Sequence, residues 1–404
     1  MVELWLPYGD TEVFVDVPVE RLLGFFEFKP PEGGISIRSI LEPAVSALSG
    51  ARTISLAIDG DLIKSVEGEE ILRGLASSLP GAGLKAFTNA GDPLPALPGL
   101  EWRKGGSADR RFEDLGRTGR GNRVLIDEDF HRSDRRVLIG KMERDPIHGH
   151  VWARRFLECV ASPETIRANA ALALDWDPMR GSEENPSYLD GAECAEIAGI
   201  DYAFFLIEGG GGGFAECAHG GFREALGAGA GRYKELYSRG IGKRARIAVS
   251  SAGGAPNDLR FESASRSVFN PLRGLEEGGA IILLAECRGG IGSAALREAF
   301  AKYKHRGRER LREALEREPS DVGIHSYFLM EAFERFKVLL VSAIPESLIK
   351  PFGIRAFRSA NSALESATRA LGGDSSVFAI ANASKTFLSP SAEDRPGGGQ
   401  PWKS

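Results

Sequence analysis

Two α/β domains are the fold that the sequence predicts, and three observations support it. The chain has 404 residues, a length typical of two domains or of one large α/β unit. Short apolar runs alternate with longer segments of helical periodicity, which is the rhythm of a parallel sheet. Glycine is abundant, at 50 residues, and most of it lies in short clusters between the apolar runs, where tight turns are expected.

The first domain is expected to span 1–245 and to begin with a β-hairpin. Residues 3–7 and 12–17 are apolar or alternating and flank Gly9-Asp10, a turn signal. The elements expected next are a helix over 35–48, a strand over 53–58, a helix over 66–78, strands over 85–88, 123–127 and 136–139, a helix over 163–169 with Ser162 as N-cap, a strand over 202–207 and a helix over 219–238.

The second domain is expected to span 246–374. Its elements, in order, are a strand over 247–250, a helix over 257–270, a strand over 279–285, a charged helix over 295–317, a strand over 337–342 and a helix over 355–371. The last strand, over 376–382, has no evident partner there, so we expect 375–388 to complete the first domain. The tail over 389–404 is rich in proline, glycine and charge, and is expected to be disordered.

Composition excludes several classes of function. The net charge of −5 gives no general attraction to nucleic acid or to an anionic membrane. No stretch reaches the roughly 18 apolar residues of a membrane-spanning helix. The four cysteines are scattered without a Cys-x-x-Cys pair, which argues against structural zinc or a redox dithiol. Together with the lack of a signal peptide, this predicts a reduced, cytoplasmic protein.

Ligands of such folds bind beyond the carboxyl ends of the strands. The loops expected there are 59–65, 88–94, 141–154, 251–258 and 286–292. These loops, read with their surroundings, resemble the nickel-dependent lactate racemase superfamily in order, spacing and motif. The matching segments are Leu6-Pro7-Tyr8-Gly9, Leu115 to Asn122, Gly140-Lys141-Met142-Glu143, Thr165-Ile166-Arg167-Ala168-Asn169, Gly253-Gly254-Ala255-Pro256-Asn257-Asp258 and Glu277-Gly278-Gly279-Ala280-Ile281-Ile282.

The resemblance implies two α/β domains with an active site in the cleft between them. It also implies a nickel-pincer nucleotide, which takes hydride from a 2-hydroxy acid and returns it to either face. In this family a lysine tethers the cofactor, one histidine ligates nickel, and two other histidines act as general acid and base. The function implied is that of a racemase or epimerase of a 2-hydroxy acid or a related small carboxylate.

Several of the residues that bind the cofactor in that family are replaced here. In the phosphate-binding loop only Asp59 carries over, and Lys64 is the cation that compensates for a lost arginine. The family's Gly-Gly-Arg-Lys reads Trp152-Ala153-Arg154-Arg155, and Ala170 stands where the histidine that ligates nickel is expected. We therefore expect no covalent attachment of the cofactor, although Arg154 could hold a phosphate or carboxylate through two parallel hydrogen bonds.

The expected catalytic histidines are also missing. Asp92 lies where the first would be and could accept a proton, although an aspartate before Pro93 is also a turn former. His148 and His150 lie a few residues beyond the second position. Separated by one glycine, they could share a metal or supply acid–base chemistry. The alternative interpretation is a polar surface loop.

Counting forward from Gly254 places Ser263 and Arg266 where the family binds its substrate, and His325 is a further candidate for that site. Arg154, Arg155 and Arg266 predict a basic cleft for a small carboxylate or phosphate.

Three functions therefore remain open: an isomerase with altered substrate or cofactor handling, a catalytically degenerate member that binds a small anion or a protein partner, and an unrelated α/β protein that binds a metabolite. The protein partner could be a second copy of this chain, in a homo-oligomer, or a paralogue with the full set of motifs.

Overall fold

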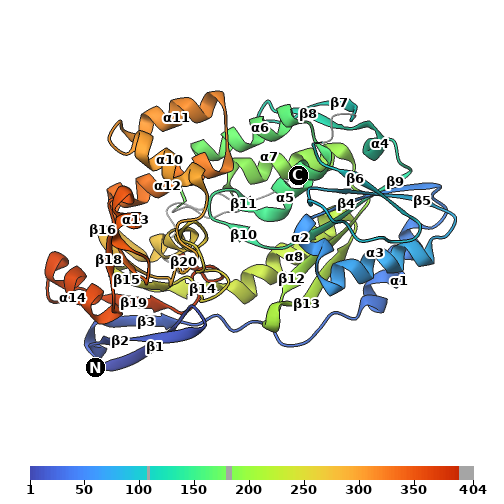
Figure 1. Cartoon of the computed structure of the whole chain (residues 1–404). Coiled ribbons are helices and arrows are strands. Elements are labelled where there is room, and N and C mark those ends of the chain that lie inside the picture. Colours follow the sequence, from blue (N-terminus) through green and yellow to red (C-terminus); the bar gives the residue numbers. More distant parts are fainter. Residues whose placement is uncertain (107–109, 179–183, 391–404) are drawn as a thin grey trace. The chain divides into compact units, whose positions relative to one another are not determined.

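The computed structural model describes residues 1–106, 110–178 and 184–390, which divide into two compact units (Figure 1). The middle unit contains residues 29–176 and 184–236, and the terminal unit contains residues 1–28, 177–178 and 237–390. Each unit is built on a six-stranded, largely parallel sheet, so the predicted class of two α/β domains is confirmed.

The sheet of the middle unit has the order β13-β12-β9-β4-β5-β6. Its strands are β4 (Thr53–Ile58), β5 (Gly83–Thr88), β6 (Leu100–Lys104), β9 (Arg135–Lys141), β12 (Tyr202–Glu208) and the antiparallel β13 (Phe214–Gly220). The chain runs outward from β4 to β6 and then returns to the other side of β4. The order therefore reverses between β4 and β9, and the carboxyl ends of these two strands form the edge at which such sheets bind ligands.

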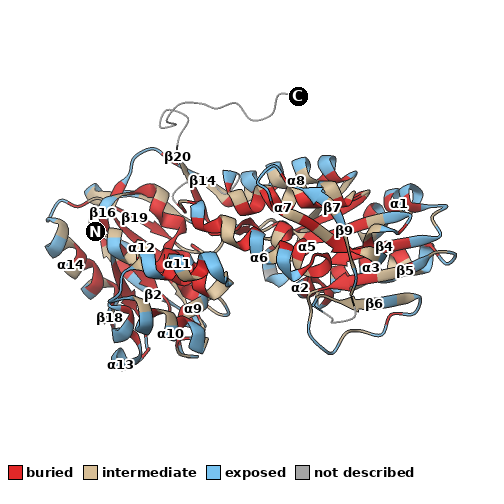
Figure 2. Cartoon of the chain, turned by 90° about the horizontal axis from the view of Figure 1, so that it is seen from above, coloured by how far each residue is buried: buried red, intermediate tan, exposed pale blue. Residues whose placement is uncertain are grey.

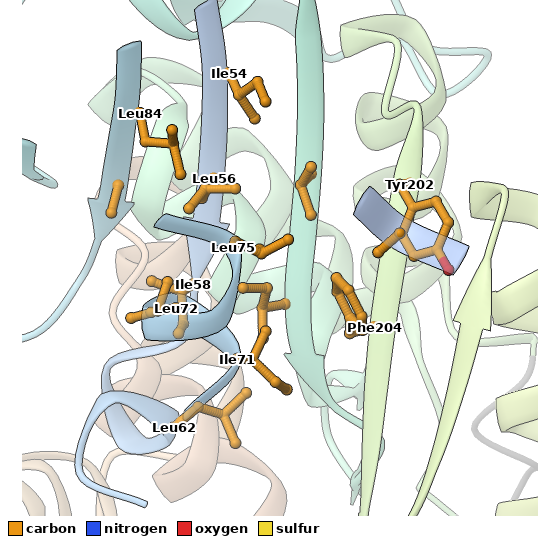
Figure 3. Packing of buried hydrophobic residues seen from close by; sticks show 14 of the residues in the cluster. Ile54, Leu56, Ile58, Leu62, Ile71, Leu72, Leu75, Leu84, Tyr202 and Phe204 are labelled. Atoms are coloured by element: carbon orange, nitrogen blue, oxygen red, sulfur yellow. The ribbon is translucent and has the colours of Figure 1, made fainter. Parts of the chain in front are cut away.

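Helices cover both faces of this sheet, and alternate residues of each strand point to opposite faces. On one face, Leu56 and Phe204 pack against Leu72 and Leu75 of α3 (Val66–Ser78), and α1 (Ile37–Leu48) joins the same core (Figure 3). On the other face, α5 (Val151–Val160) buries Trp152 against Phe205, with ring centroids 5.2 Å apart.

The remaining elements of the middle unit lie around these layers. They are α2 (Gly60–Ile63), the antiparallel pair β7 (Phe112–Arg117) and β8 (Arg123–Asp127), α4 (Glu128–His131), the short pair β10 (Arg144–Asp145) and β11 (Gly149–His150), α6 (Pro163–Leu172), α7 (Pro186–Ala198) and α8 (Phe222–Tyr237). The predicted N-cap of α6 is confirmed, because Ser162 accepts a hydrogen bond from the Thr165 backbone N–H.

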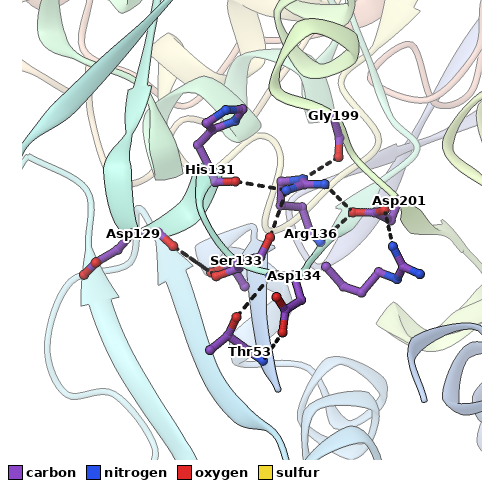
Figure 4. A network of polar contacts seen from close by, with 10 residues as sticks. Thr53, Asp129, His131, Ser133, Asp134, Arg136, Gly199 and Asp201 are labelled. Atoms are coloured by element: carbon purple, nitrogen blue, oxygen red, sulfur yellow. Dashed lines mark hydrogen bonds and ion pairs between the residues drawn. The ribbon is translucent and has the colours of Figure 1, made fainter. Parts of the chain in front are cut away.

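Polar contacts fasten the amino-terminal end of β9 (Figure 4). Arg136 donates to the carbonyl oxygens of Gly199 at 2.6 Å and of His131 and Ser133 at 2.9 Å, and it forms an ion pair with Asp201 at 2.9 Å. These residues hold the loop before β9 to the loop before β12. They lie at the opposite end of the strands from the ligand-binding edge, so we assign them a structural role.

The sheet of the terminal unit is parallel throughout, with the order β18-β17-β16-β15-β19-β3. Its strands are β3 (Leu22–Phe26), β15 (Ala245–Ser251), β16 (Leu275–Leu284), β17 (Lys337–Val341), β18 (Arg355–Phe357) and β19 (Val377–Ile380). The predicted hairpin, β1 (Val2–Tyr8) and β2 (Thr11–Val17), packs with α14 (Ala360–Leu371) on one face of this sheet. In Figure 2 the strands of this sheet are mostly buried (red), and the helices around them have exposed outer faces.

The place of the last strand corrects the predicted domain boundaries. Residues 376–382 were expected to complete the first domain, but β19 pairs with β15 and β3 inside the terminal sheet. All four residues of β19 are buried, as a central strand requires, and its other neighbour comes from the N-terminal segment. The beginning of the chain therefore joins the terminal unit. Ser389 belongs to β20 (Phe387–Pro390), which pairs with β14 (Ser238–Ile241), while 391–404 lie outside the described residues.

Other expected elements differ in extent. The helix predicted over 219–238 begins only at Phe222, because β13 occupies 214–220. The helix over 295–317 is two, α10 (Ala294–Tyr303) and α11 (Arg308–Arg317), separated at Gly307, whose φ is 87°. The helix over 257–270 is reduced to α9 (Phe261–Ala264) and the 3₁₀ turn Ser265–Val268. The Ser265 hydroxyl donates to the Glu262 carbonyl there, a local bond that competes with helix propagation.

One long helix, α12 (Asp321–Arg335), was not predicted. Nine of its residues are buried, so it lacks the one-sided apolar stripe by which a helix is usually detected. No helix of the described residues has both the length and the apolar character needed to cross a membrane.

Candidate functional site

The carboxyl end of β4 holds Asp59, the one residue of the expected phosphate loop that carries over. Its side chain caps α2 and accepts a hydrogen bond from the Asp61 backbone N–H at 3.1 Å. Asp59 is only 4% exposed, and Arg155 approaches it with Nε 3.9 Å from Oδ1. Asp59 therefore acts as a buried helix cap with one nearby cation.

The loops after β4 and β5 are tied to α5 through Asn89. The Gly60 backbone N–H donates to Asn89 Oδ1, and Asn89 Nδ2 donates to Glu158 Oε2, both at 2.8 Å. Arg155 Nη1 lies 2.9 Å from that same Glu158 oxygen. The polar groups of this edge therefore bind one another.

This network gives Arg154 other partners, and its expected cofactor-binding role stays a prediction. Arg154 Nη1 donates to the carbonyl oxygen of Ile166 at 2.8 Å, and its Nε lies 3.3 Å from Glu158, so Arg155 is the arginine beside Asp59. Around the loop, the two guanidinium groups are already paired with the carboxylates of Asp59, Asp61 and Glu158. A phosphate dianion would compete with these carboxylates for the same cations. Lys64, the other expected cation, is the exposed C-cap of α2.

The buried carboxyl of Asp59 should make stability depend on pH. Burial raises the pKa of Asp59, although Arg155 acts in the opposite direction. A folded-state pKa above the unfolded value of about 3.9 means that protonation stabilises the fold. That contribution is complete below the unfolded pKa and is lost as the pH rises through the folded pKa.

We therefore expect Asp59→Asn to gain stability relative to the wild type as the pH is raised from 4 to 7, because asparagine caps a helix equally well without a charge. Urea unfolding of both proteins at the two pH values measures the difference, and Asp374→Asn, a change at an exposed residue, is the control. A difference that shrinks with rising pH would contradict the expectation.

The residues present do not fit a tethered nickel-pincer nucleotide. Arg154 and Arg155 are engaged with Glu158 and other groups, and a guanidinium is a poor nucleophile for covalent attachment. Ala170 is 2% exposed on α6 and its methyl group cannot ligate a metal. No step of a reaction is therefore assigned to this cofactor here.

An ion cluster that the sequence did not reveal lies at the carboxyl ends of β9 and β12. Lys141 Nζ is 2.8 Å from a carboxylate oxygen of Glu143 and 2.8 Å from one of Glu208. Burial alone would lower the pKa of Lys141, but the two carboxylates outweigh it and hold the pKa above its usual range. This favours the protonated form of Lys141, held between the two carboxylates. The motif that contains Lys141 was visible in the sequence. Glu208 lies so far along the chain that the sequence did not show its pairing with Lys141.

His148 and His150 are both buried, at 8% and 3% exposure, so the alternative of a polar surface loop is wrong. Asp145 Oδ1 accepts hydrogen bonds from the Ile147 and His148 backbone N–H groups, both at 2.8 Å, and turns the chain between β10 and β11. His150 packs against Tyr188, with ring centroids 5.0 Å apart.

The surroundings of His150 offer a small cavity of about 160 Å³, which Arg144, Tyr233 and Lys234 also line. The described residues contain no group of three or more His, Cys, Asp or Glu side chains that could hold a metal ion. A metal shared by His148 and His150 would therefore lack a further ligand of these types from the described chain.

Asp92, the expected substitute base, lies on the surface. Its side chain is 77% exposed and forms an ion pair with Lys104. This supports the turn-forming interpretation of Asp92 and not the catalytic one, because nothing sequesters the carboxylate from water.

The three expected substrate-binding residues are all in the terminal unit, but only two reach the surface. Ser263 on α9 and Arg266 on the following 3₁₀ turn are exposed and three residues apart, which places them on neighbouring positions of one helical face. His325 is 2% exposed and its Nε2 hydrogen bonds to Ser265 Oγ at 2.9 Å. His325 therefore lies in the core of the terminal unit, bonded to Ser265, and its expected contact with substrate stays a prediction.

Several of the motifs that carried the family resemblance have structural roles. Asp258 of the Gly-Gly-x-Pro-x-Asp motif accepts hydrogen bonds from the backbone N–H groups of Gly9 at 2.7 Å and Glu286 at 3.1 Å. Ser251 donates to the Pro7 carbonyl oxygen at 2.5 Å. These bonds fix the turn between β1 and β2 at the carboxyl ends of β15 and β16.

A second support is a buried polar network in the middle unit. Asp190 is fully buried and accepts hydrogen bonds from Thr118 at 2.6 Å, Asn122 at 2.8 Å and Asn169 at 2.9 Å. These donors come from the glycine-rich hairpin and the Ala-Asn motif that carried the resemblance. Their shared acceptor joins the two motifs in one buried network.

Comparisons with known proteins agree with this architecture. Residues 242–386 match the family described as the lactate racemase C-terminal domain. The apoprotein of lactate racemase from Thermoanaerobacterium thermosaccharolyticum is similar in structure, with a TM-score of 0.83 and 18% identity over 96% of this chain and all of that one. A protein from Thermotoga maritima is similar with a TM-score of 0.58 and 12% identity, covering 88% of this chain and 97% of the other. A comparison with curated protein sequences gave no match.

Proposed function

We infer the function from one premise: the chain is a lactate racemase-like protein, with a lactate racemase C-terminal domain over residues 242–386 and the fold of that enzyme along nearly its whole length. On this basis we propose that it binds a small carboxylate of the 2-hydroxy acid class through Arg266 and Ser263. We further propose that it does not racemise lactate with a tethered nickel-pincer nucleotide.

The observation that carries this proposal is the closed network at the carboxyl end of β4. Where a phosphate-binding loop and a tethering lysine are expected, Asn89 joins the Gly60 backbone N–H to Glu158, and Arg155 lies beside both Glu158 and Asp59. An anionic nucleotide in this place would compete with those bonds and add negative charge beside three carboxylates. Ser263 and Arg266 present an exposed hydroxyl and an exposed cation at the position expected for substrate.

Substitution of Arg266 should weaken the binding of a small carboxylate. A charge-assisted bidentate pair contributes about 1.5–3 kcal/mol, so Arg266→Ala is expected to lower the affinity for lactate roughly tenfold or more. Isothermal titration with each enantiomer of lactate measures the effect, and Arg297→Ala, a change at another exposed arginine of the terminal unit, is the matched control. Equal affinities in the wild type and Arg266→Ala would remove Arg266 from the site.

An isomerase remains the second candidate, because His150 lines a cavity together with Arg144 and Tyr233. Racemising an unactivated 2-hydroxy acid requires a hydride acceptor, however, and an imidazole cannot be one. His148 and His150 would therefore support a different step, such as proton abstraction beside a carbonyl. Turnover of a 2-keto or 2-hydroxy acid by the wild type, lost in the His148→Ala, His150→Ala double variant, would favour this candidate over the binding protein.

A further inference from the structure

A second cavity in the middle unit, of about 570 Å³, lies beside β6 and the β7–β8 pair. Basic side chains line much of it: Arg103, Lys104, Arg110 and Arg111, with Trp102 and Asp127 among the other lining residues. None of these residues belongs to the loops from which a site was expected. Its volume lies within the range of about 300–1,000 Å³ that small-molecule sites occupy.

Arg110 is the buried centre of this lining. Its side chain is 6% exposed, and its Nε donates to Asp127 Oδ2 at 2.6 Å. The rings of Phe87 and Phe112 lie near the guanidinium carbon, with centroids 5.7 and 5.4 Å away. Asp127 is itself held as the N-cap of α4, so the ion pair fixes Arg110 in one orientation.

The other two nitrogens of Arg110 are not satisfied in the same way. Nη1 and Nη2 are buried and have no hydrogen-bond partner among the described residues. Contacts with aromatic rings stabilise the faces of a guanidinium, whereas its N–H groups point outward within its plane. A buried donor without an acceptor costs about 1–3 kcal/mol, and more when it is charged. An acceptor supplied by a ligand would remove this cost.

The charges around the cavity favour a ligand that is an anion. The lining carboxylates are paired: Glu128 with Arg132, Asp129 with Lys85 at 3.2 Å and with Arg103 at 3.4 Å, and Asp127 with Arg110 through Nε alone. Among the other lining cations, Arg103 also pairs with Glu101 at 2.9 Å and Lys104 with Asp92. Among the described residues, the four lining cations, Arg103, Lys104, Arg110 and Arg111, still outnumber the three lining carboxylates.

We propose that this cavity binds a small organic anion, whose carboxylate or phosphate group accepts two parallel hydrogen bonds from Nη1 and Nη2 of Arg110. Planar, end-on recognition of an oxyanion is the geometry that a guanidinium favours. The site lies in the middle unit, whereas Ser263 and Arg266 are in the terminal unit. It therefore shares no residue with the proposed carboxylate site and does not depend on it.

Titration calorimetry with inorganic phosphate and with succinate, used as separate probes, tests the proposal and distinguishes the two kinds of head group. Arg110→Lys keeps the charge and the ion pair with Asp127 but loses the paired N–H edge. We expect the wild type to bind at least one probe, and Arg110→Lys to bind it roughly tenfold more weakly or worse.

Two controls accompany this experiment. Arg132→Lys, at a cation outside the cavity, and Arg266→Ala, in the other unit, are both expected to leave the affinity for the better probe unchanged. Circular dichroism checks that Arg110→Lys remains folded. The proposal is overturned if neither probe binds the wild type at millimolar concentration, or if Arg110→Lys binds as tightly as the wild type.

If Arg110→Lys does not fold, the affinity of Lys104→Gln for the better probe tests the proposal instead. Lys104 is partly exposed and forms an ion pair with the surface residue Asp92, so its loss should be tolerated. A severalfold loss of affinity in this variant supports the anion site, and an unchanged affinity contradicts it.

Discussion

Replacing Asp190 with alanine is expected to lower the free energy of unfolding of this protein by about 3 kcal/mol or more. Its carboxylate is fully buried and accepts hydrogen bonds from Thr118, Asn122 and Asn169. Each donor that is left without its acceptor costs about 1–3 kcal/mol. The Asn122 and Asn169 amides keep weaker alternatives, at the carbonyl oxygens of Thr165 and Ser187, so the three losses do not add in full.

Urea unfolding followed by tryptophan fluorescence measures this loss, and a second substitution on the same helix controls for it. Glu196 lies on α7, like Asp190, but is exposed and pairs with Arg223 at the surface. Glu196→Ala should therefore change the stability by less than about 0.5 kcal/mol. The loss of stability in Asp190→Asn should lie between these two. Asparagine keeps one acceptor oxygen, but its amide N–H groups would face the donors of Thr118, Asn122 and Asn169. A loss below about 1 kcal/mol for Asp190→Ala would show that the network is not a unit of stability.

The second large effect is expected in the chemistry of the cofactor. Produced together with the enzymes that make the nickel-pincer nucleotide, the chain should keep its unmodified mass and should not racemise lactate. Arginines replace the tethering lysine, and Ala170 replaces the ligand of nickel. The acidic network around Asp59 further opposes the cofactor phosphate.

Intact-mass spectrometry gives a readout that does not depend on activity, and a lactate racemase with the full set of motifs, produced in the same cells, is the positive control. A stable increase in the mass of this chain, while the control is also loaded, would contradict the expectation. Racemisation without a change in mass would instead point to a cofactor held without a covalent bond, and would return attention to His148 and His150.

The sequence by itself predicted the class of two α/β domains. Periodicity located most strands and the cap of α6, because burial on a sheet face and capping of free N–H groups leave local patterns in the chain. The order of motifs indicated the lactate racemase resemblance, and the identities of Arg154, Arg155 and Ala170 followed from reading the chain.

The tertiary structure decided which polar residues meet. The sequence made both His325 and Asp92 candidate site residues. In the structure His325 is buried and bonded to Ser265, whereas Asp92 is 77% exposed. Lys141 was part of a recognised motif, but its partner Glu208 comes from another strand, 67 positions away. Burial and long-range pairing depend on how the elements pack, and a local pattern does not encode them.

The same reason explains the two largest surprises. β19 has the apolar composition of any buried strand, so composition could not tell which sheet it would enter, and only its pairing with β15 and β3 decided this. Arg110 is one of many arginines in the sequence. It becomes a candidate for binding an anion only because the fold buries it beside Phe87 and Phe112, binds its Nε to Asp127, and leaves its outer edge without an acceptor among the described residues. The chain specifies which groups are present, but the free energy of each group depends on the neighbours that folding brings to it.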